Sequence, residues 1–209
     1  MQTWLDCLRD QRAIAVIRSD DPEQARRAAH ALAAGGLRSL EITWNSAQPD
    51  TLVRQLRQEL PHCWLGAGTI LERGQLDAAI AAGSQFIFSP HVNADLIAIA
   101  RAADRPIVAG ALTPSEIVAA WQAGATAVKV FPVQALGGAD YIRRLQGPLG
   151  TIPLIPTGGV TCANARELIQ AGAIAVGLAS QLLPPELMRD GDWNAITNRA
   201  RDLLTRLKP

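Results

Sequence analysis

One phrase recurs four times along this chain: an Ala-Gly pair that leads into an apolar segment. The copies read AGGLRSLEIT, AGSQFIFSP, AGATAVKVFP and AGAIAVGLAS, and they start at residues 34, 82, 123 and 171. Their first glycines, residues 35, 83, 124 and 172, are therefore 48, 41 and 48 residues apart. A glycine after a helix can adopt the left-handed conformation that stops the helix. Each phrase thus predicts the end of a helix followed by a strand.

Further apolar runs lie between these phrases, namely AIAVIR, WLGAGT, PIVAGA and PLIPTGG. Together they predict about eight strands, separated by helical segments such as DPEQARRAAHALAAGG, which Asp21 caps and Pro22 opens. The runs are continuously apolar, as is typical of parallel strands covered on both faces. We expect one domain over residues 1–209, a (β/α)8 barrel with a short N-terminal helix. A doubly wound open sheet is the alternative.

Charge and composition argue against several classes of function. A net charge of +1 without any basic run argues against a nucleic-acid or anionic-membrane surface. No apolar stretch reaches the roughly 18 residues of a membrane span, and the N-terminus does not resemble a signal peptide, so we expect a cytoplasmic protein. The three cysteines and three histidines follow no metal-ligand spacing. We therefore expect reduced thiols, no metal and no cofactor.

Polar residues and glycines gather where the predicted strands end. Active sites of such barrels lie at the carboxyl ends of the strands, so this rim is the predicted site. Strand by strand, it holds Arg18, Glu41, Thr69, Pro90, Lys129, Gly158 with Gly159, and Ser180.

Lysine is nearly absent from the chain. Of the 20 basic residues, only Lys129 and Lys208 are lysines, and the other 18 are arginines. Lys129 lies in TAVKVFP, where strand alternation places it on the other face of the strand from Val128 and Val130. If the valines face the helices, Lys129 points into the barrel. Burial there would lower the pKa of the amine and let it attack a ketone to form an imine. The alternative is a lysine that extends from the strand end into solvent.

Glu41 also lies in an apolar context, at the end of SLEI. If burial raises its pKa, this carboxyl can act as a general acid and base. The alternative is a structural carboxylate paired with an arginine. An amine and a carboxyl that converge in one barrel mouth favour the catalytic interpretation.

Two glycine-containing segments predict a phosphate site. PTGGV (156–160) precedes a predicted helix in TCANARELIQAG, and GLASQLL (177–183) precedes another helical turn. Amide groups at a helix N-terminus bind phosphate, and barrels commonly hold it after strands 7 and 8. Gly158, Gly159 and Ser180 are therefore the candidate phosphate ligands.

The motifs EITWNS, GAGTIL, FIFSPH, TPSE, VKVFP and PTGGV, in this order, resemble the family of 2-keto-3-deoxy-6-phosphogluconate (KDPG) and 4-hydroxy-2-ketoglutarate (KHG) aldolases. The resemblance covers nearly the whole chain. It implies a class I aldolase on a (β/α)8 barrel, usually a homotrimer, that cleaves a phosphorylated keto-deoxy sugar acid to pyruvate and glyceraldehyde 3-phosphate. The implied site comprises Lys129 as imine lysine, Glu41 as proton shuttle, Thr69 at the pyruvyl group, Pro90 and Phe131 as further substrate contacts, and the glycine loop with Ser180 at the phosphate.

Two positions depart from the family's pattern. Asn45 stands where many members have an arginine that holds the substrate carboxylate, and His91 stands where many have glycine. Asparagine also occurs in relatives that cleave the galactonate epimer, so the preferred epimer stays open, as does activity on KHG. Arg18 is then the nearest candidate to hold the carboxylate beside Asn45. The alternative is that Arg18 pairs with Glu41 or with an acid of SDDPE.

Two other classes of function share part of this pattern. A phosphate-binding barrel isomerase would keep PTGGV but would not need Lys129 as a nucleophile. A sugar-phosphate sensor would keep the pocket without turnover. Trapping of an imine with borohydride separates both from an aldolase.

Overall fold

The computed structural model describes residues 3–208, in which strands and helices alternate. The strands are β1 (Ala13–Ile17), β2 (Ser39–Thr43), β3 (Trp64–Gly68), β4 (Ile87–Phe88), β5 (Ile107–Ala111), β6 (Ala127–Val130), β7 (Leu154–Pro156) and β8 (Val176–Leu178). The helices are α1 (Trp4–Gln11), α2 (Pro22–Ala34), α3 (Pro49–Glu59), α4 (Arg73–Ala81), α5 (Ala94–Ala102), α6 (Pro114–Gln122), α7 (Ala139–Leu149), α8 (Ala165–Gln170), α9 (Pro185–Asp190) and α10 (Trp193–Leu207). A short 3₁₀ helix, η1 (Val133–Leu136), follows β6.

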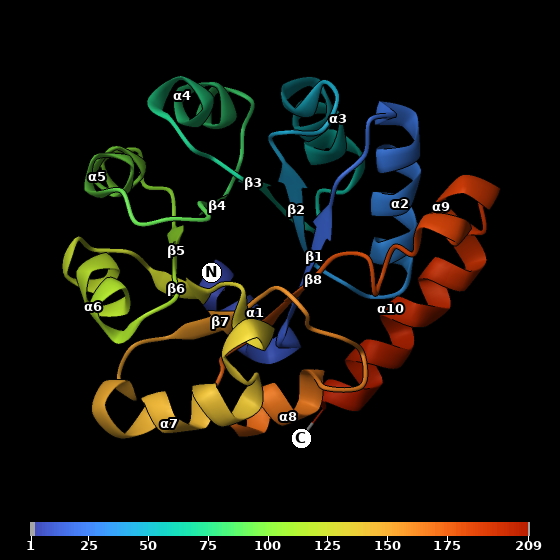
Figure 1. The fold of residues 1–209 in the computed structure, drawn as a ribbon. Coiled ribbons are helices and arrows are strands. Elements are labelled where there is room, and N and C mark those ends of the chain that lie inside the picture. Colours follow the sequence, from blue (N-terminus) through green and yellow to red (C-terminus); the bar gives the residue numbers. More distant parts are fainter. Residues whose placement is uncertain (1–2, 209) are drawn as a thin grey trace.

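The strands form one parallel barrel. Each strand from β1 to β6 pairs with the next, and β8 pairs with β1. A bridge between Thr157 and Gly177, together with a hydrogen bond from the Ile174 amide to the Leu154 carbonyl (3.0 Å), joins the β7 side to the β8 side. The helices form a ring around the strands (Figure 1). The predicted (β/α)8 fold is confirmed, and the open doubly wound sheet is excluded.

Strand alternation sorts the apolar residues into an outer and an inner cluster. Val128 and Val130 belong to the outer cluster, between the strands and the surrounding helices. Ala127 belongs to the inner cluster, which also includes Trp4 of α1 and Phe86. The rings of Trp4 and Phe86 stack with centroids 4.5 Å apart. Because α1 leads directly into β1, it fills the amino-terminal end of the barrel and leaves the other end for a site (Figure 1).

The repeated glycines stop helices as predicted in three of the four phrases. Gly83, Gly124 and Gly172 follow α4, α6 and α8 with φ of 92°, 98° and 110°. In the first phrase the prediction is wrong by one residue, because Gly36 adopts the left-handed conformation, with φ of 99°. Gly35 serves a different purpose. A Cβ atom there would overlap Ala200, so this glycine lets α10 pack closely against α2.

Asp21 caps α2 as predicted. Its carboxylate accepts hydrogen bonds from the amides of Glu23 (2.9 Å) and Gln24 (3.2 Å), and Pro22 occupies the first turn. Such a cap satisfies amides that the helix itself leaves unpaired. Of the helices in residues 3–208, none combines the length and the apolarity needed to cross a membrane.

Two predicted boundaries are wrong. Glu41 lies in the middle of its strand, which continues to Thr43. The segment TCAN forms a turn, and α8 begins only at Ala165. In this turn the Thr161 amide donates to Asn164 Oδ1 (2.8 Å) and the Asn164 amide donates to Thr161 Oγ1 (3.1 Å). These local side-chain bonds compete with helical hydrogen bonds and delay the helix.

Candidate active site

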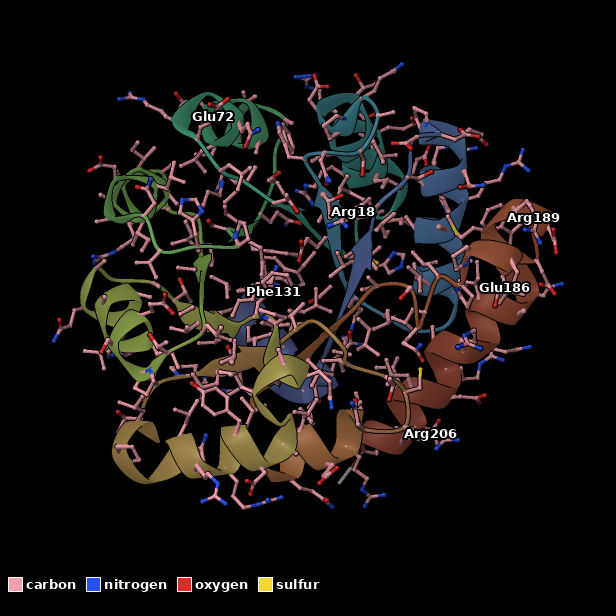
Figure 2. All side chains as sticks on the ribbon, in the orientation of Figure 1. Arg18, Glu72, Phe131, Glu186, Arg189 and Arg206 are labelled. Carbon is pink, nitrogen blue, oxygen red and sulfur yellow. The ribbon has the colours of Figure 1, made fainter. Side chains whose placement is uncertain are left out.

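A cavity of about 360 Å³ opens at the carboxyl ends of the strands. With the exception of Asn45, every residue predicted for the site lines this cavity, and Asn45 is exposed in the loop after β2. Arg18 and Phe131 both lie inside the ring of helices (Figure 2). The lining residues are Val16, Arg18, Glu41, Thr69, Pro90, Lys129, Phe131, Thr157, Gly158, Gly159, Val160, Thr161, Gly177, Ala179, Ser180 and Gln181.

Lys129 reaches the cavity from inside the barrel. Its neighbours Val128 and Val130 pack outward, so the period of two along β6 turns Lys129 inward, as predicted. Lys129 is only 7% exposed, and its Nζ lies 4.8 Å from the centre of the Phe131 ring. Burial lowers the pKa of the amine below that of an ordinary lysine. A larger fraction of Lys129 is therefore neutral and nucleophilic at neutral pH.

Glu41 faces the same cavity from β2 and is 2% exposed. Burial raises the pKa of its carboxyl, while the nearby charges of Lys129 and Arg18 act in the opposite direction. The carboxylate lies directly over Gly68 of β3, where a Cβ atom would overlap Oε1. Among residues 3–208, neither Glu41 nor Lys129 is held by a side-chain hydrogen bond or an ion pair. Both groups are thus available to a ligand.

Arg18 follows β1 at the rim of the cavity, with its side chain exposed. Within the described part of the chain it forms no ion pair, either with Glu41 or with the acids of SDDPE. The next residue is fixed on both sides, because the Ser19 amide donates to Ser46 Oγ (3.3 Å) and the Ser19 carbonyl accepts from the Ala47 amide (3.0 Å). The loop that carries Asn45 therefore anchors the backbone beside Arg18.

The glycine loop after β7 and the turn after β8 form one wall of the cavity. Gly158 and Gly159 have φ of 83° and 81°, a conformation that favours glycine. In residues 3–208, no hydrogen-bond acceptor is found for the amides of Gly158, Gly159, Ser180 or Gln181. Successive unpaired amides of this kind bind anions. We refer to these four residues as the anion wall. They lie in loops and not at the N-terminus of α8, as the sequence suggested, since that helix begins five residues beyond Val160.

Thr157 also lines the cavity, and it is not among the residues predicted from the sequence. It lies at the end of β7, and its Oγ1 is buried without a hydrogen-bond partner among the described residues. A buried hydroxyl without a partner is costly, so a ligand in the cavity is the natural partner. The signal was present in the sequence. Ile155 belongs to the inner cluster, and alternation along β7 therefore turns Thr157 inward as well.

His91, the second residue that departs from the family's pattern, lies just outside this cavity. His91 lines a neighbouring cavity together with Glu116, and Pro90 and Phe131 border both. His91 Nδ1 lies 3.0 Å from the hydroxyl of the buried Ser89. No group of three His, Cys, Asp or Glu side chains with metal-binding geometry is found in residues 3–208.

Residues 5–199 match the model of a protein family described as KDPG and KHG aldolase. The chain belongs to this family. It is 33% identical over 198 residues to the 2-dehydro-3-deoxy-phosphogluconate aldolase of Pseudomonas aeruginosa, covering 95% of this chain and 90% of the relative. It is also 33% identical over 180 residues to the KHG/KDPG aldolase of Escherichia coli K12, covering 86% of this chain and 84% of the relative.

Solved structures of aldolases share the fold of this family member. The KDPG aldolase of Legionella pneumophila, which holds pyruvate as a covalent carbinolamine intermediate, matches with a TM-score of 0.87 at 28% identity over 94% of this chain and 96% of that one. A structure described as native KDPGal matches with a TM-score of 0.85 at 29% identity over 93% of each chain. The resemblance found in the sequence motifs is confirmed by these matches and by the family model.

Proposed function

We propose that the protein is a class I aldolase that reversibly cleaves KDPG to pyruvate and glyceraldehyde 3-phosphate, with Lys129 as its nucleophile. One observation carries this proposal. A buried amine of lowered pKa and a buried carboxyl of raised pKa face one cavity, and unpaired amides form one wall of the same cavity. A pair of titratable groups whose environments shift their pKa values is the arrangement expected of acid-base and nucleophilic catalysis.

The geometry supports the following sequence of steps. Lys129 Nζ attacks the C2 ketone, water leaves, and an iminium forms. Glu41 accepts the proton of the C4 hydroxyl while the C3–C4 bond breaks, and the electron pair of that bond moves into the iminium to give an enamine. Glyceraldehyde 3-phosphate departs. Glu41 returns the proton to C3, and hydrolysis of the resulting iminium releases pyruvate and regenerates the amine.

The remaining contacts of the cavity position the two ends of the substrate. The amides of Gly158, Gly159 and Ser180 bind the phosphate, which uses remote binding energy to align the breaking bond. Thr69, Pro90 and Phe131 surround the pyruvyl end near Lys129. The buried hydroxyl of Thr157 takes a hydroxyl of the substrate as its missing hydrogen-bond partner.

The galactonate epimer of KDPG is the second candidate substrate, favoured by Asn45 and by the likeness to the KDPGal structure. Purified protein should release pyruvate from KDPG, measured by coupling to lactate dehydrogenase, and the epimer and KHG are assayed in parallel. Higher kcat/KM for the galactonate epimer would reassign the substrate. Absence of pyruvate from all three compounds would favour the isomerase or sensor alternatives.

We further propose that residues 1–209 act as one aldolase domain and assemble as a homotrimer, as the family resemblance implies. A designed cage built by fusing symmetric oligomeric domains contains a chain that matches this one with a TM-score of 0.84 at 29% identity, over 93% of this chain and 71% of that one. Light scattering after gel filtration should give three times the chain mass of 22.3 kDa. A monomer that retains full activity would contradict the trimer and leave the aldolase assignment intact.

Ser180→Asp tests the anion wall. The new carboxylate would repel the phosphate by about 3 kcal/mol for unit charges ~5 Å apart at an effective dielectric constant of ~20, equivalent to roughly a hundredfold in affinity. KM should therefore rise far more for KDPG than for KHG, which lacks a phosphate. Ser180→Ala is the matched control, and it should change both substrates little, since backbone amides bind the anion. Equal damage to both substrates by Ser180→Asp would show that this turn is only structural.

Arg18→Ala tests how the pyruvyl carboxylate is held. Loss of a charge-assisted hydrogen bond of about 1.5–3 kcal/mol corresponds to a roughly tenfold to hundredfold weaker affinity for pyruvate. The matched control is Arg189→Ala. Arg189 lines a neighbouring cavity that Arg18 also borders, and it forms an ion pair with Asp190 (3.0 Å) (Figure 2). Asn45→Arg should be tolerated and should partly rescue Arg18→Ala. Unchanged pyruvate affinity with an altered pH profile would mean that Arg18 only tunes the ionisation of Glu41.

A further inference from the structure

Arg199 of α10 makes two hydrogen bonds to a single backbone carbonyl at the edge of the site. Its Nε and Nη2 donate to the Gln181 carbonyl oxygen at 2.9 and 2.7 Å. Arg199 is half-buried, and within residues 3–208 it forms no ion pair with an acid. Gln181 itself lines the cavity next to Ser180. A charged group on the outer helix thus holds a residue of the anion wall.

The turn that carries Gln181 is otherwise held by few bonds. The amides of Leu182 and Leu183 donate to the Ala179 carbonyl at 2.9 and 3.0 Å, which closes one turn of backbone. The Gln181 carbonyl also lies 3.9 Å from Cys162 Sγ, in the segment that follows the glycine loop. The turn after β8 and the segment after β7 therefore meet at this carbonyl. Figure 1 shows α10 passing alongside α8 and α9, where it can reach both.

We propose that Arg199 is a positioning residue for the phosphate end of the substrate. Its guanidinium fixes the Gln181 carbonyl, which shares a peptide unit with the Leu182 amide, and so holds in place the turn that presents the unpaired amides of Ser180 and Gln181 to the anion. A cation at the carbonyl end of a turn also stabilises the turn's dipole, as it does at the end of a helix. Because Arg199 forms no ion pair with an acid among residues 3–208, its charge adds to the attraction for a phosphate dianion. This role rests on the proposed phosphate site, and it adds a residue that does not line the cavity.

Three variants separate this role from general stability. Arg199→Met removes both hydrogen bonds and the charge, and Arg199→Lys keeps the charge but not the paired geometry. Arg201→Met is the matched control on the same helix, where the side chain of Arg201 is exposed and, among residues 3–208, donates only to Asn198 (3.0 Å). The readouts are KM for KDPG and for KHG, competitive inhibition by inorganic phosphate, and the rate of pyruvate trapping by borohydride.

We expect Arg199→Met to raise KM for KDPG and to weaken inhibition by inorganic phosphate, each roughly tenfold, as for loss of one hydrogen bond to a charged group. Arg199→Lys should restore part of both effects. KM for KHG and the trapping rate should stay within about twofold of the wild-type values, and Arg201→Met should match the wild type throughout. Equal losses on both substrates, or no loss on either, would overturn the proposal.

Phosphate affinity is also measured directly, by calorimetry with inorganic phosphate on the wild type and the three variants. This arm does not depend on turnover. If the wild type cleaves none of the substrates but binds phosphate, and Arg199→Met weakens that binding, the proposed function fails while the positioning role stands. If the wild type binds no phosphate, or the variant binds it as well as the wild type does, the positioning role fails.

Discussion

Lys129→Met should abolish aldol cleavage, with kcat/KM lowered by at least about 10⁴-fold, or ~5.5 kcal/mol in transition-state stabilisation. Methionine preserves an unbranched apolar stem inside the barrel but offers no amine to the C2 ketone. Loss of folding would not account for this result, because removing a buried amine also removes its desolvation penalty. The melting temperature of Lys129→Met should therefore equal or exceed that of the wild type.

Two controls sharpen this result. Lys129→Arg should be equally inactive, since arginine cannot present a neutral amine. Lys208→Met should be fully active, because the only other lysine is exposed near the end of the chain. Turnover by Lys129→Met at the wild-type rate would exclude the covalent mechanism. It would favour the alternative of a phosphate-binding barrel isomerase, which needs no imine.

Glu41→Gln should lower kcat by about 10²- to 10⁴-fold, the range typical of a general acid-base group. Glutamine keeps the shape that packs over Gly68 but cannot carry the proton of the C4 hydroxyl. Gly68→Ala should produce a similar defect, because its methyl group would displace the Glu41 carboxylate. Melting curves must show that both variants are folded. Wild-type kcat in a folded Glu41→Gln would place the acid-base group elsewhere.

Glu41→Gln should also shift the pH dependence of imine formation. The charge of Glu41 favours the ammonium form of Lys129 and so raises the pKa of Lys129, partly offsetting the larger effect of burial. Without that charge the pKa of Lys129 falls further. The pH at half-maximal pyruvate trapping should therefore be lower in Glu41→Gln than in the wild type. A shift to higher pH would show that the two groups are not coupled through their charges.

Much of this architecture is predictable because it depends on local patterns. The glycine that stops a helix and the alternation around Lys129 act within a few residues, and they suffice to predict the barrel and the inward amine. The rest depends on contacts between distant segments. Gly36 and not Gly35 adopts the left-handed conformation, and Gly35 instead lies against Ala200, near the other end of the chain, where a side chain would not fit.

The same distinction applies to the site. The pairing of Asn164 with Thr161 delays α8, so the helix N-terminus that the sequence suggested does not follow directly on the glycine loop. Asn45 occupies a motif position but does not line the cavity, and the loop that carries it anchors Ser19. Arg199 belongs to none of the sequence motifs. Its place beside Gln181 follows only from the way α10 packs.

The most direct test of the account is to incubate the wild-type protein with pyruvate and borohydride and to map the modified peptide by mass spectrometry. Reduction of the imine adds the mass of pyruvic acid less one oxygen atom. The imine mechanism predicts this addition on the peptide that contains Lys129 and nowhere else. No addition is expected when borohydride is added without pyruvate. No adduct, or an adduct confined to Lys208 or the N-terminal amine, would contradict it.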